Sequence, residues 1–188
     1  MKIIALNGWP KSGKTEVAEI IVRRYGGVIV DDALPLRRAV PHLFHGVDPS
    51  DCYTQEGKAK VIEVGGKPYT VRQLLGFVGD VMEERFGEFY LPEQAYLAAQ
   101  QMMPAAYYIF PSVRKTEGWY YRYRGGAVVE IQRPEAKDSG NAFDRWDHSA
   151  RTHVISNTGS LTDLENSVAA FMHKTFKDAG YAQVQMAA

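Results

Sequence analysis

Short apolar runs alternate with amphipathic stretches along this chain of 188 residues. The first run, residues 2–6, stops at the turn pair Asn7-Gly8, which predicts a buried strand. Residues 16–25 follow with apolar side chains at helical spacing. Further strands are predicted at 28–30, 105–110, 127–131 and 152–156, and further helices at 34–45, 70–86, 92–103, 115–124 and 161–177. Because strands alternate with helices, we predict an α/β fold: a parallel sheet flanked by helices, with the ligand at the carboxyl ends of the strands.

Two segments depart from this alternation. Residues 46–70 form a small predicted insertion, which contains a β-hairpin at 61–64 and 68–70 across a glycine turn. Residues 133–151 are polar, charged and poor in aliphatic side chains, so we expect a flexible lid there. The tail at 181–188 is expected to be loosely held. The length of the chain predicts one domain over residues 1–188.

The junction between the first strand and the first helix carries the most specific chemistry. Residues 8–15 read GWPKSGKT, the G-x-x-x-x-G-K-T pattern of phosphate-binding loops. Glycines let the backbone N–H groups turn towards phosphate oxygens, and the helix adds its positive end. Lys14 can reach the β- and γ-phosphates, and the hydroxyl of Thr15 can ligate Mg²⁺. The alternative is a glycine-rich turn that merely precedes a helix. The residues of this loop predicted to bind ATP are Gly8, Lys11, Ser12, Gly13, Lys14 and Thr15.

A pair of carboxylates, Asp31-Asp32, follows the second predicted strand. A hydroxyl acceptor gains from a carboxylate that takes its proton, whereas a phosphate acceptor is already anionic and would be repelled. We therefore predict an alcohol acceptor, with Asp32 as the first choice of base and Asp31 as the second. Alternatively, the pair caps the following helix. Arg37 and Arg38, one turn into that helix, either hold acceptor phosphates or are solvated.

Aromatic residues leave further alternatives open. Trp119 and Tyr123 share one face of a predicted helix, which favours packing on the sheet over stacking on nucleic-acid bases. Trp146 lies in the predicted lid, where the sequence offers no apolar framework. It could stack on a base, or it or Phe143 could anchor the closed lid.

The amino-acid composition excludes several classes of protein and of binding site. Lys and Arg number 22, as do Asp and Glu, so a nucleic-acid substrate would need a local basic groove. No run approaches the roughly 18 apolar residues of a membrane span, and no targeting segment precedes the first strand. We therefore expect a cytoplasmic protein, in the infected host cell if it is viral. The single cysteine, Cys52, excludes a disulfide framework and a thiolate metal site. The spacing of Asp144, Asp147 and His148 matches no strong metal site.

Several further stretches occur in a familiar order. They are 70–75 with Gly79-Asp80, 107–114, Arg133-Pro134 and 154–161. Together with the loop at 8–15 they resemble the bacteriophage deoxynucleoside monophosphate kinases. The resemblance implies a P-loop nucleotide-kinase fold in which the base of ATP rests against Asn157-Thr158-Gly159. It also implies roles for arginines: Arg72 facing the acceptor, Arg114 near the phosphates, and Arg133, Arg145 and Arg151 in the lid near the transferring group.

This chain departs from those kinases at three points. Ser112 stands where they carry an Asp after the third strand, the chain is shorter, and Asp31-Asp32 is unexpected beside a phosphate acceptor. Among their relatives, the alcohol-accepting type that the chain resembles is the 5-hydroxymethyluracil DNA kinase of thymine hypermodification. The expected activity is thus ATP-dependent phosphorylation of the hydroxymethyl group of that base in phage DNA. The alternatives are a deoxynucleoside monophosphate kinase that makes diphosphates and a nucleotide-binding switch that transfers nothing.

Overall fold

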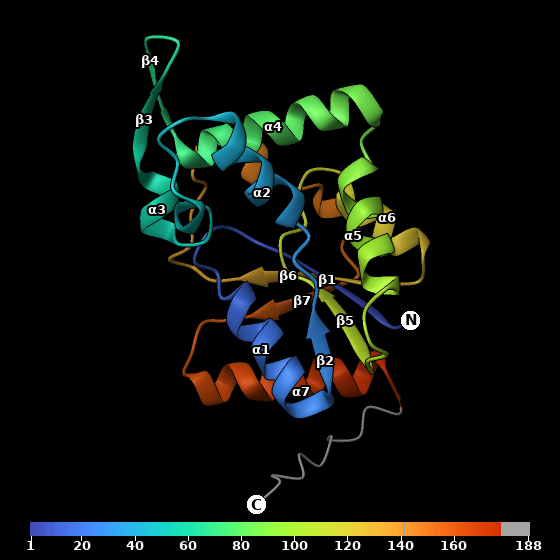
Figure 1. Cartoon of the computed structure of the whole chain (residues 1–188). Helices are drawn as coiled ribbons and strands as arrows, with labels where there is room; N and C mark the ends of the chain where they lie inside the picture. The colour runs from blue at the N-terminus through green and yellow to red at the C-terminus, as the bar shows by residue number, and fades with distance from the viewer. Residues whose placement is uncertain (141, 178–188) are drawn as a thin grey trace, which may run out of the picture.

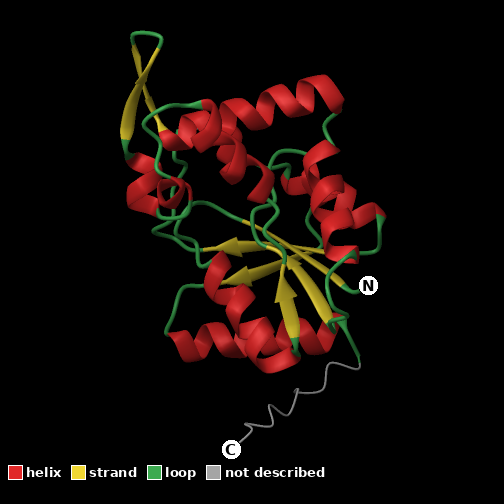
Figure 2. Ribbon diagram, viewed as in Figure 1, coloured by secondary structure: helices red, strands yellow, loops and turns green. Residues whose placement is uncertain are grey.

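A five-stranded parallel sheet forms the centre of the computed structural model, which describes residues 1–140 and 142–177 (Figures 1 and 2). The strands lie in the order β2-β5-β1-β6-β7, and every neighbouring pair is parallel. Their bounds are β1 Ile3–Asn7, β2 Gly27–Ile29, β5 Tyr107–Phe110, β6 Ala127–Gln132 and β7 His153–Ser156. The predicted α/β fold with a parallel sheet is therefore confirmed. The predicted tail at 181–188 lies outside the described residues.

Helices cover both faces of the sheet (Figure 1). On one face lie α1 (Lys14–Tyr25) and α7 (Leu161–Thr175), and on the other α5 (Tyr90–Gln100) and α6 (Glu117–Tyr123). The central strand β1 alternates between the two cores: Ile4 and Leu6 pack with the first pair of helices, and Ile3 and Ala5 with the second. Because both faces are buried, this strand reads as a continuous apolar run rather than as an alternating one.

A second layer lies beyond the carboxyl edge of the sheet, as Figure 1 shows. It contains α2 (Leu34–Leu43), the 3₁₀ turn η1 (Pro49–Cys52), α3 (Gln55–Ala59) and α4 (Val71–Phe86). The predicted hairpin is confirmed as β3 (Val61–Val64) paired antiparallel with β4 (Lys67–Thr70) in a separate sheet. A core of its own, which includes Val40, Cys52 and Val71, holds this layer together.

The segment 133–151, which we call the lid segment, is packed onto the protein. It contains two 3₁₀ turns, η2 (Ala142–Asp144) and η3 (His148–Ala150). Its backbone joins that of Lys115: the Lys115 N–H donates to Arg145 O at 2.6 Å, and the Asp147 N–H donates to Lys115 O at 2.7 Å. Within the described residues, no helix combines the length and apolarity needed to cross a bilayer.

Two expectations about aromatic residues are wrong. Trp146 does have an apolar framework: it is buried, and its ring lies 4.7 Å from that of Trp9 between centroids. Trp119 and Tyr123 do not pack on the sheet; they stack on each other at 5.5 Å, with Tyr123 71% exposed. The phase of the helix explains this, because Tyr120 and Tyr121 are the aromatic residues of α6 that turn inward, and Tyr121 lies against Phe110 of β5.

Candidate functional site

The turn between β1 and α1 has the backbone geometry that its glycines permit. Gly8 and Gly13 adopt φ values of 140° and 103°, which favour glycine. A Cβ at Gly8 would lie 2.6 Å from Ile131 O, so the backbone approach is too close for a side chain. Lys11 also has a positive φ, 67°. The Ser12 N–H closes the turn by donating to Trp9 O at 3.1 Å.

Several polar groups of this turn are open to a ligand. The first N–H groups of any helix lack an intrahelical acceptor, and within the described residues no side chain caps those of α1. Ser12 Oγ is buried without a hydrogen-bond partner in the described structure. The Lys14 ammonium folds back on the turn and donates to Gly8 O at 2.6 Å and Trp9 O at 2.9 Å. Burial lowers the pKa of Lys14 to about 7, and the nearby Arg114 adds to the shift. An anion here would gain both a helix N-terminus and a lysine whose partners, within the described residues, are carbonyls rather than carboxylates.

The loop after β7 docks directly onto this turn. Asn157 Nδ2 donates to Ser12 O at 2.8 Å, and a Cβ at Gly13 would clash with the same Nδ2. A cavity beside the turn is bounded by β6, β7 and the lid segment, and includes Trp9, Thr158 and Trp146 in its lining. Gly159 is exposed and lies next to Asp163, the residue that helps to cap α7. The predicted base-binding loop is thus adjacent to the predicted phosphate-binding turn.

The two adjacent carboxylates after β2 have different surroundings. Asp31 forms a bidentate ion pair with Arg37 Nη1, at 2.9 Å to each oxygen. Asp32 Oδ2 accepts from the Ser112 N–H at 2.8 Å, while its Oδ1 is buried and has no partner in the described structure. Burial raises the pKa of Asp32 to about 6 against the opposing hydrogen bond from Ser112. Neither carboxylate caps α2, whose N-cap is Ala33 without a side-chain hydrogen bond, so the capping alternative is wrong.

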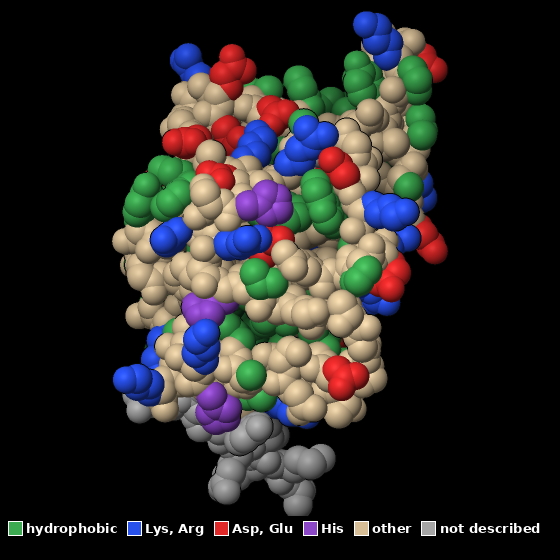
Figure 3. Space-filling view, turned by 180° about the vertical axis from the view of Figure 1, so that it is seen from behind, with side chains coloured by type: hydrophobic (Ala, Val, Ile, Leu, Met, Phe, Trp, Pro, Cys, Tyr) green, Lys and Arg blue, Asp and Glu red, His purple; other side chains and the backbone are tan. Residues whose placement is uncertain are grey.

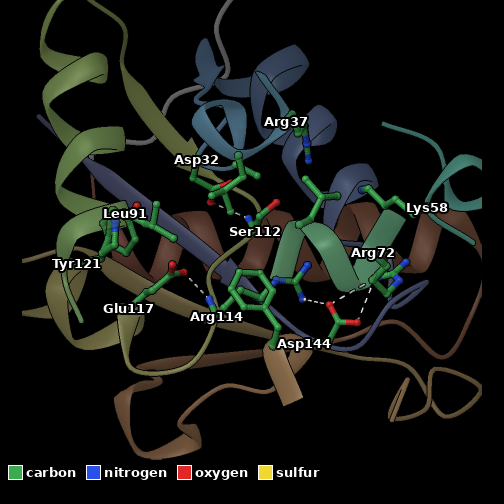
Figure 4. A pocket seen from close by; sticks show the side chains of 15 residues that line it. Asp32, Arg37, Lys58, Arg72, Leu91, Ser112, Arg114, Glu117, Tyr121 and Asp144 are labelled. Carbon is green, nitrogen blue, oxygen red and sulfur yellow. Dashed lines mark hydrogen bonds and ion pairs between the residues drawn. The ribbon is translucent and has the colours of Figure 1, made fainter. Parts of the chain in front are cut away.

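Asp32 lines a pocket between the sheet edge and the second layer (Figure 4). Four cations from four separate elements line the same pocket, and we call them the cation cluster: Arg37 of α2, Lys58 of α3, Arg72 of α4 and Arg114 of the turn after β5. In Figure 4, Asp32 and Glu117 lie towards one side of the pocket and Lys58 and Arg72 towards the other. The pocket therefore has an acidic end and a cationic end.

The lid segment reaches into this pocket with a buried carboxylate. Asp144 pairs with Arg72 at 3.0 Å and with Arg114 at 3.1 Å, although only 2% of the residue is exposed. Phe143, its neighbour, lies against α4 where Gly76 and Gly79 leave room for the ring. These contacts link the lid segment to Arg72 and Arg114, two of the site residues predicted from the sequence.

Three charged members of this pocket were not predicted from the sequence: Asp144, Lys58 and Glu117. Glu117 is buried at the start of α6 and accepts the Arg114 N–H at 2.6 Å. Burial raises the pKa of Glu117 to about 8, and the nearby Asp32 adds to the shift. Lys58 belongs to a five-residue helix in the insertion, where no sequence pattern marks it. Only the tertiary structure brings these residues to the pocket.

Other predicted site residues lie elsewhere. Arg38 is exposed and does not line the pocket. In the lid segment, Arg145 pairs with Asp138 at 3.2 Å and Arg133 with Glu135 at 3.1 Å, both on the surface. Arg151 pairs with Glu130 at 3.0 Å. In the structure described, the lid arginines therefore do not reach the pocket that contains Asp32.

No cluster suited to a resident metal is found in the described part of the chain. The three polar residues of the lid segment considered above turn to different partners: Asp144 to two arginines, Asp147 to Trp119 Nε1 at 2.9 Å, and His148 to Glu130. A scan of the chain against models of known protein families finds no match, and a search of curated protein sequences finds none either. Function must therefore be inferred from the chemistry of the site.

Proposed function

We propose that this chain is an ATP-dependent kinase with a P-loop nucleotide-kinase fold that phosphorylates a hydroxyl acceptor. The acceptor that we favour is the hydroxymethyl group of 5-hydroxymethyluracil in phage DNA. One observation carries the proposal: a buried carboxylate oxygen without a partner, Asp32 Oδ1, lies in a pocket lined by cations. The pocket adjoins the glycine turn, since Arg114, Asp144 and Arg72 are all electrostatic neighbours of Lys14.

The turn from Gly8 to Gly13 and the start of α1 would hold the triphosphate. The free N–H groups of the first helical turn and the positive end of the helix suit phosphate oxygens. Lys14 would leave its carbonyl partners and pair with the β- and γ-phosphates. The hydroxyl of Thr15, in the first turn of α1, would ligate Mg²⁺, which neutralises phosphate charge when it is bound.

Asp32 would act as the general base. Its Oδ2 is fixed by the Ser112 N–H, which leaves Oδ1 to accept the proton of an acceptor hydroxyl. The hydroxyl oxygen then forms a bond to the γ-phosphorus, and the bond to the bridging oxygen of ADP breaks. With its pKa raised to about 6, Asp32 is mostly ionised near neutral pH and is a stronger base than an ordinary aspartate. Asp31 is occupied by Arg37 and would position that arginine.

The second candidate is a deoxynucleoside monophosphate kinase, and the cation cluster is the observation that favours it. Three arginines and a lysine suit a dianionic phosphate as well as a DNA backbone. Against it, Asp32 lies in the same pocket, and its carboxylate, mostly ionised near neutral pH, would repel an incoming phosphate.

Labelled ATP offered to both acceptors separates these candidates. The chain is incubated with γ-labelled Mg-ATP and either DNA containing 5-hydroxymethyluracil or a panel of deoxynucleoside monophosphates, with unmodified DNA as the control. We expect label in high-molecular-weight DNA only when the hydroxymethyl group is present. Labelled diphosphates would instead identify the monophosphate kinase. ATP consumption that is independent of any acceptor would point to a nucleotide-binding switch and contradict the kinase proposal.

A further inference from the structure

The cation cluster contains one member that has no counter-ion. Arg37 pairs with Asp31, while Arg72 and Arg114 share Asp144. Within the described part of the chain, no hydrogen bond or ion pair joins Lys58 to another residue. Three arginines and one lysine line this pocket, and Asp31 and Asp144 are the carboxylates that pair with the arginines. Even with Asp32 of the same pocket ionised, four positive charges meet three negative ones, and Lys58 is the cation left without a paired carboxylate in the described residues.

The surroundings of Lys58 make this excess of positive charge unfavourable for the protein when no anion is bound. Burial lowers the pKa of Lys58 to about 8, and Arg37, Arg72 and Arg114 lower it further against the opposing effect of Asp144. A partly buried cation among like charges destabilises the fold unless an anion compensates it. Such a cluster inside a cavity is therefore typical of a binding site rather than of a structural network.

The overall charge of the molecule offers no general attraction for an anion. The chain carries as many acidic as basic residues, and Figure 3 shows basic and acidic side chains interspersed over the face seen from behind. An anionic acceptor would consequently be drawn to the pocket rather than to a broad basic surface.

We propose that the cation cluster binds a phosphate group that the acceptor already carries, and that Lys58 is its principal partner. Figure 4 shows the Lys58 side chain reaching the pocket from the side opposite Asp32. A molecule with a phosphate at the cationic end would thus present a separate hydroxyl to the acidic end. The shared chemistry is a phosphate oxyanion next to a free hydroxyl, as in a phosphodiester of DNA or in a free nucleoside monophosphate. That the anion belongs to the acceptor rests on the proposed kinase function, whereas anion binding at Lys58 does not.

Amine reactivity tests the anion site without any assay of turnover. The full chain is acetylated briefly with acetic anhydride near pH 8, and the modification of each lysine is measured by mass spectrometry. Lys60 is the internal control, because it lies two residues away and pairs with Asp51 at 2.6 Å. We expect Lys58 to react faster than Lys60, since the neutral amine is the reactive form and the pKa of Lys58 is lowered whereas that of Lys60 is raised.

Four ligands are then compared in the same reaction: inorganic phosphate, a deoxynucleoside monophosphate, a DNA oligonucleotide and Mg-ATP. Protection of Lys58 by about fivefold or more, with Lys60 unchanged, supports the site. The oligonucleotide or the monophosphate, whichever protects at the lower concentration, identifies the source of the phosphate. Unprotected Lys58 under all four ligands would overturn the proposal, and so would protection by Mg-ATP alone, which would assign this lysine to the donor.

Kinetics of matched variants then connect the site to the acceptor. Lys58→Ala should raise the KM for the acceptor by about 10-fold or more while kcat and the KM for ATP change little. Lys58→Arg should restore most of the affinity, and Lys60→Ala should leave all three constants unchanged. An unchanged acceptor KM in an active Lys58→Ala enzyme would refute the acceptor assignment and leave the kinase function standing. Conversely, an inactive wild-type chain that still shows phosphate protection would refute the kinase function and leave the anion site standing.

Discussion

Replacing Asp32 by Asn should abolish activity and stabilise the fold, because both effects follow from the loss of one buried negative charge. The Asn side chain can still accept the Ser112 N–H through its amide oxygen, so the local hydrogen bond is kept. The variant loses the negative charge that burial makes unfavourable. It also loses the ability to take a proton from the acceptor, which for a general base reduces kcat by about 10²-fold or more.

The size of the stability effect follows from the shift in pKa. The folded state raises the pKa of Asp32 from 3.8 to about 6, so between these values the folded chain binds more protons than the unfolded chain. The free energy of unfolding of the wild type therefore falls as pH rises through this window, and the full penalty, about 3 kcal/mol, is present above it. Asn does not titrate. The stability advantage of Asp32→Asn should accordingly grow by about 1.4 kcal/mol from about pH 5 to about pH 8.

Chemical denaturation of both proteins at several pH values measures this difference. Asp31→Asn is the matched control, since the neighbouring carboxylate lies in a bidentate ion pair with Arg37. It should destabilise the chain or leave stability unchanged, and it should keep most of the activity. An Asp32→Asn variant that was less stable than the wild type at pH 8, or a difference that did not vary with pH, would refute the electrostatic account of this residue. A variant with nearly normal kcat would refute its role as a base.

Three further predictions concern other parts of the site. Lys14→Ala should reduce turnover by about 10³-fold or more while circular dichroism and Tm stay close to those of the wild type, because the lysine contacts only loop carbonyls in the described structure. Asp144→Asn should lower the free energy of unfolding by about 3 kcal/mol, measured by denaturation, since it breaks a buried ion pair and leaves Arg72 and Arg114 without a counter-ion. Gly79→Ala should destabilise by about 1–3 kcal/mol, because the new Cβ would lie 2.7 Å from the ring of Phe143. A stabilised Gly79→Ala variant would show that helix propensity outweighs this clash.

Local sequence signals predicted the sheet and the glycine turn that we propose holds the donor. Gly8 and Gly13 have positive φ values, and a Cβ at either position would clash with a neighbouring atom. The structure therefore needs glycine at the two positions where the motif has it. Asp32 could be selected because it follows a buried strand, and the carboxyl edge of a parallel sheet is where ligands bind. These inferences needed only the order of elements along the chain.

The rest of the pocket proposed to hold the acceptor could not be predicted, because its residues meet only through tertiary packing. Lys58 comes from a short helix whose position depends on the core around Cys52 and Val71. The polar composition of the lid segment indicated a solvated flap, but composition does not reveal that Asp144 finds two arginines from distant parts of the chain. The burial of Trp146 likewise depends on Trp9, a residue of the glycine turn that lies far away in the sequence.

The contacts of the lid segment connect the two halves of the proposed reaction. Trp146 packs on Trp9 within the turn proposed to hold the donor, and Asp144, two residues earlier, pairs with both Arg72 and Arg114 in the pocket proposed to hold the acceptor. A phosphate that takes these arginines as partners competes with Asp144, because each guanidinium serves either anion with the same donors. Release of Asp144 would in turn disturb the packing of its neighbours on the donor turn. Under the proposed function, one stretch of chain thus contacts both the acceptor pocket and the donor turn, which is a physical basis on which occupancy of one site would influence the other.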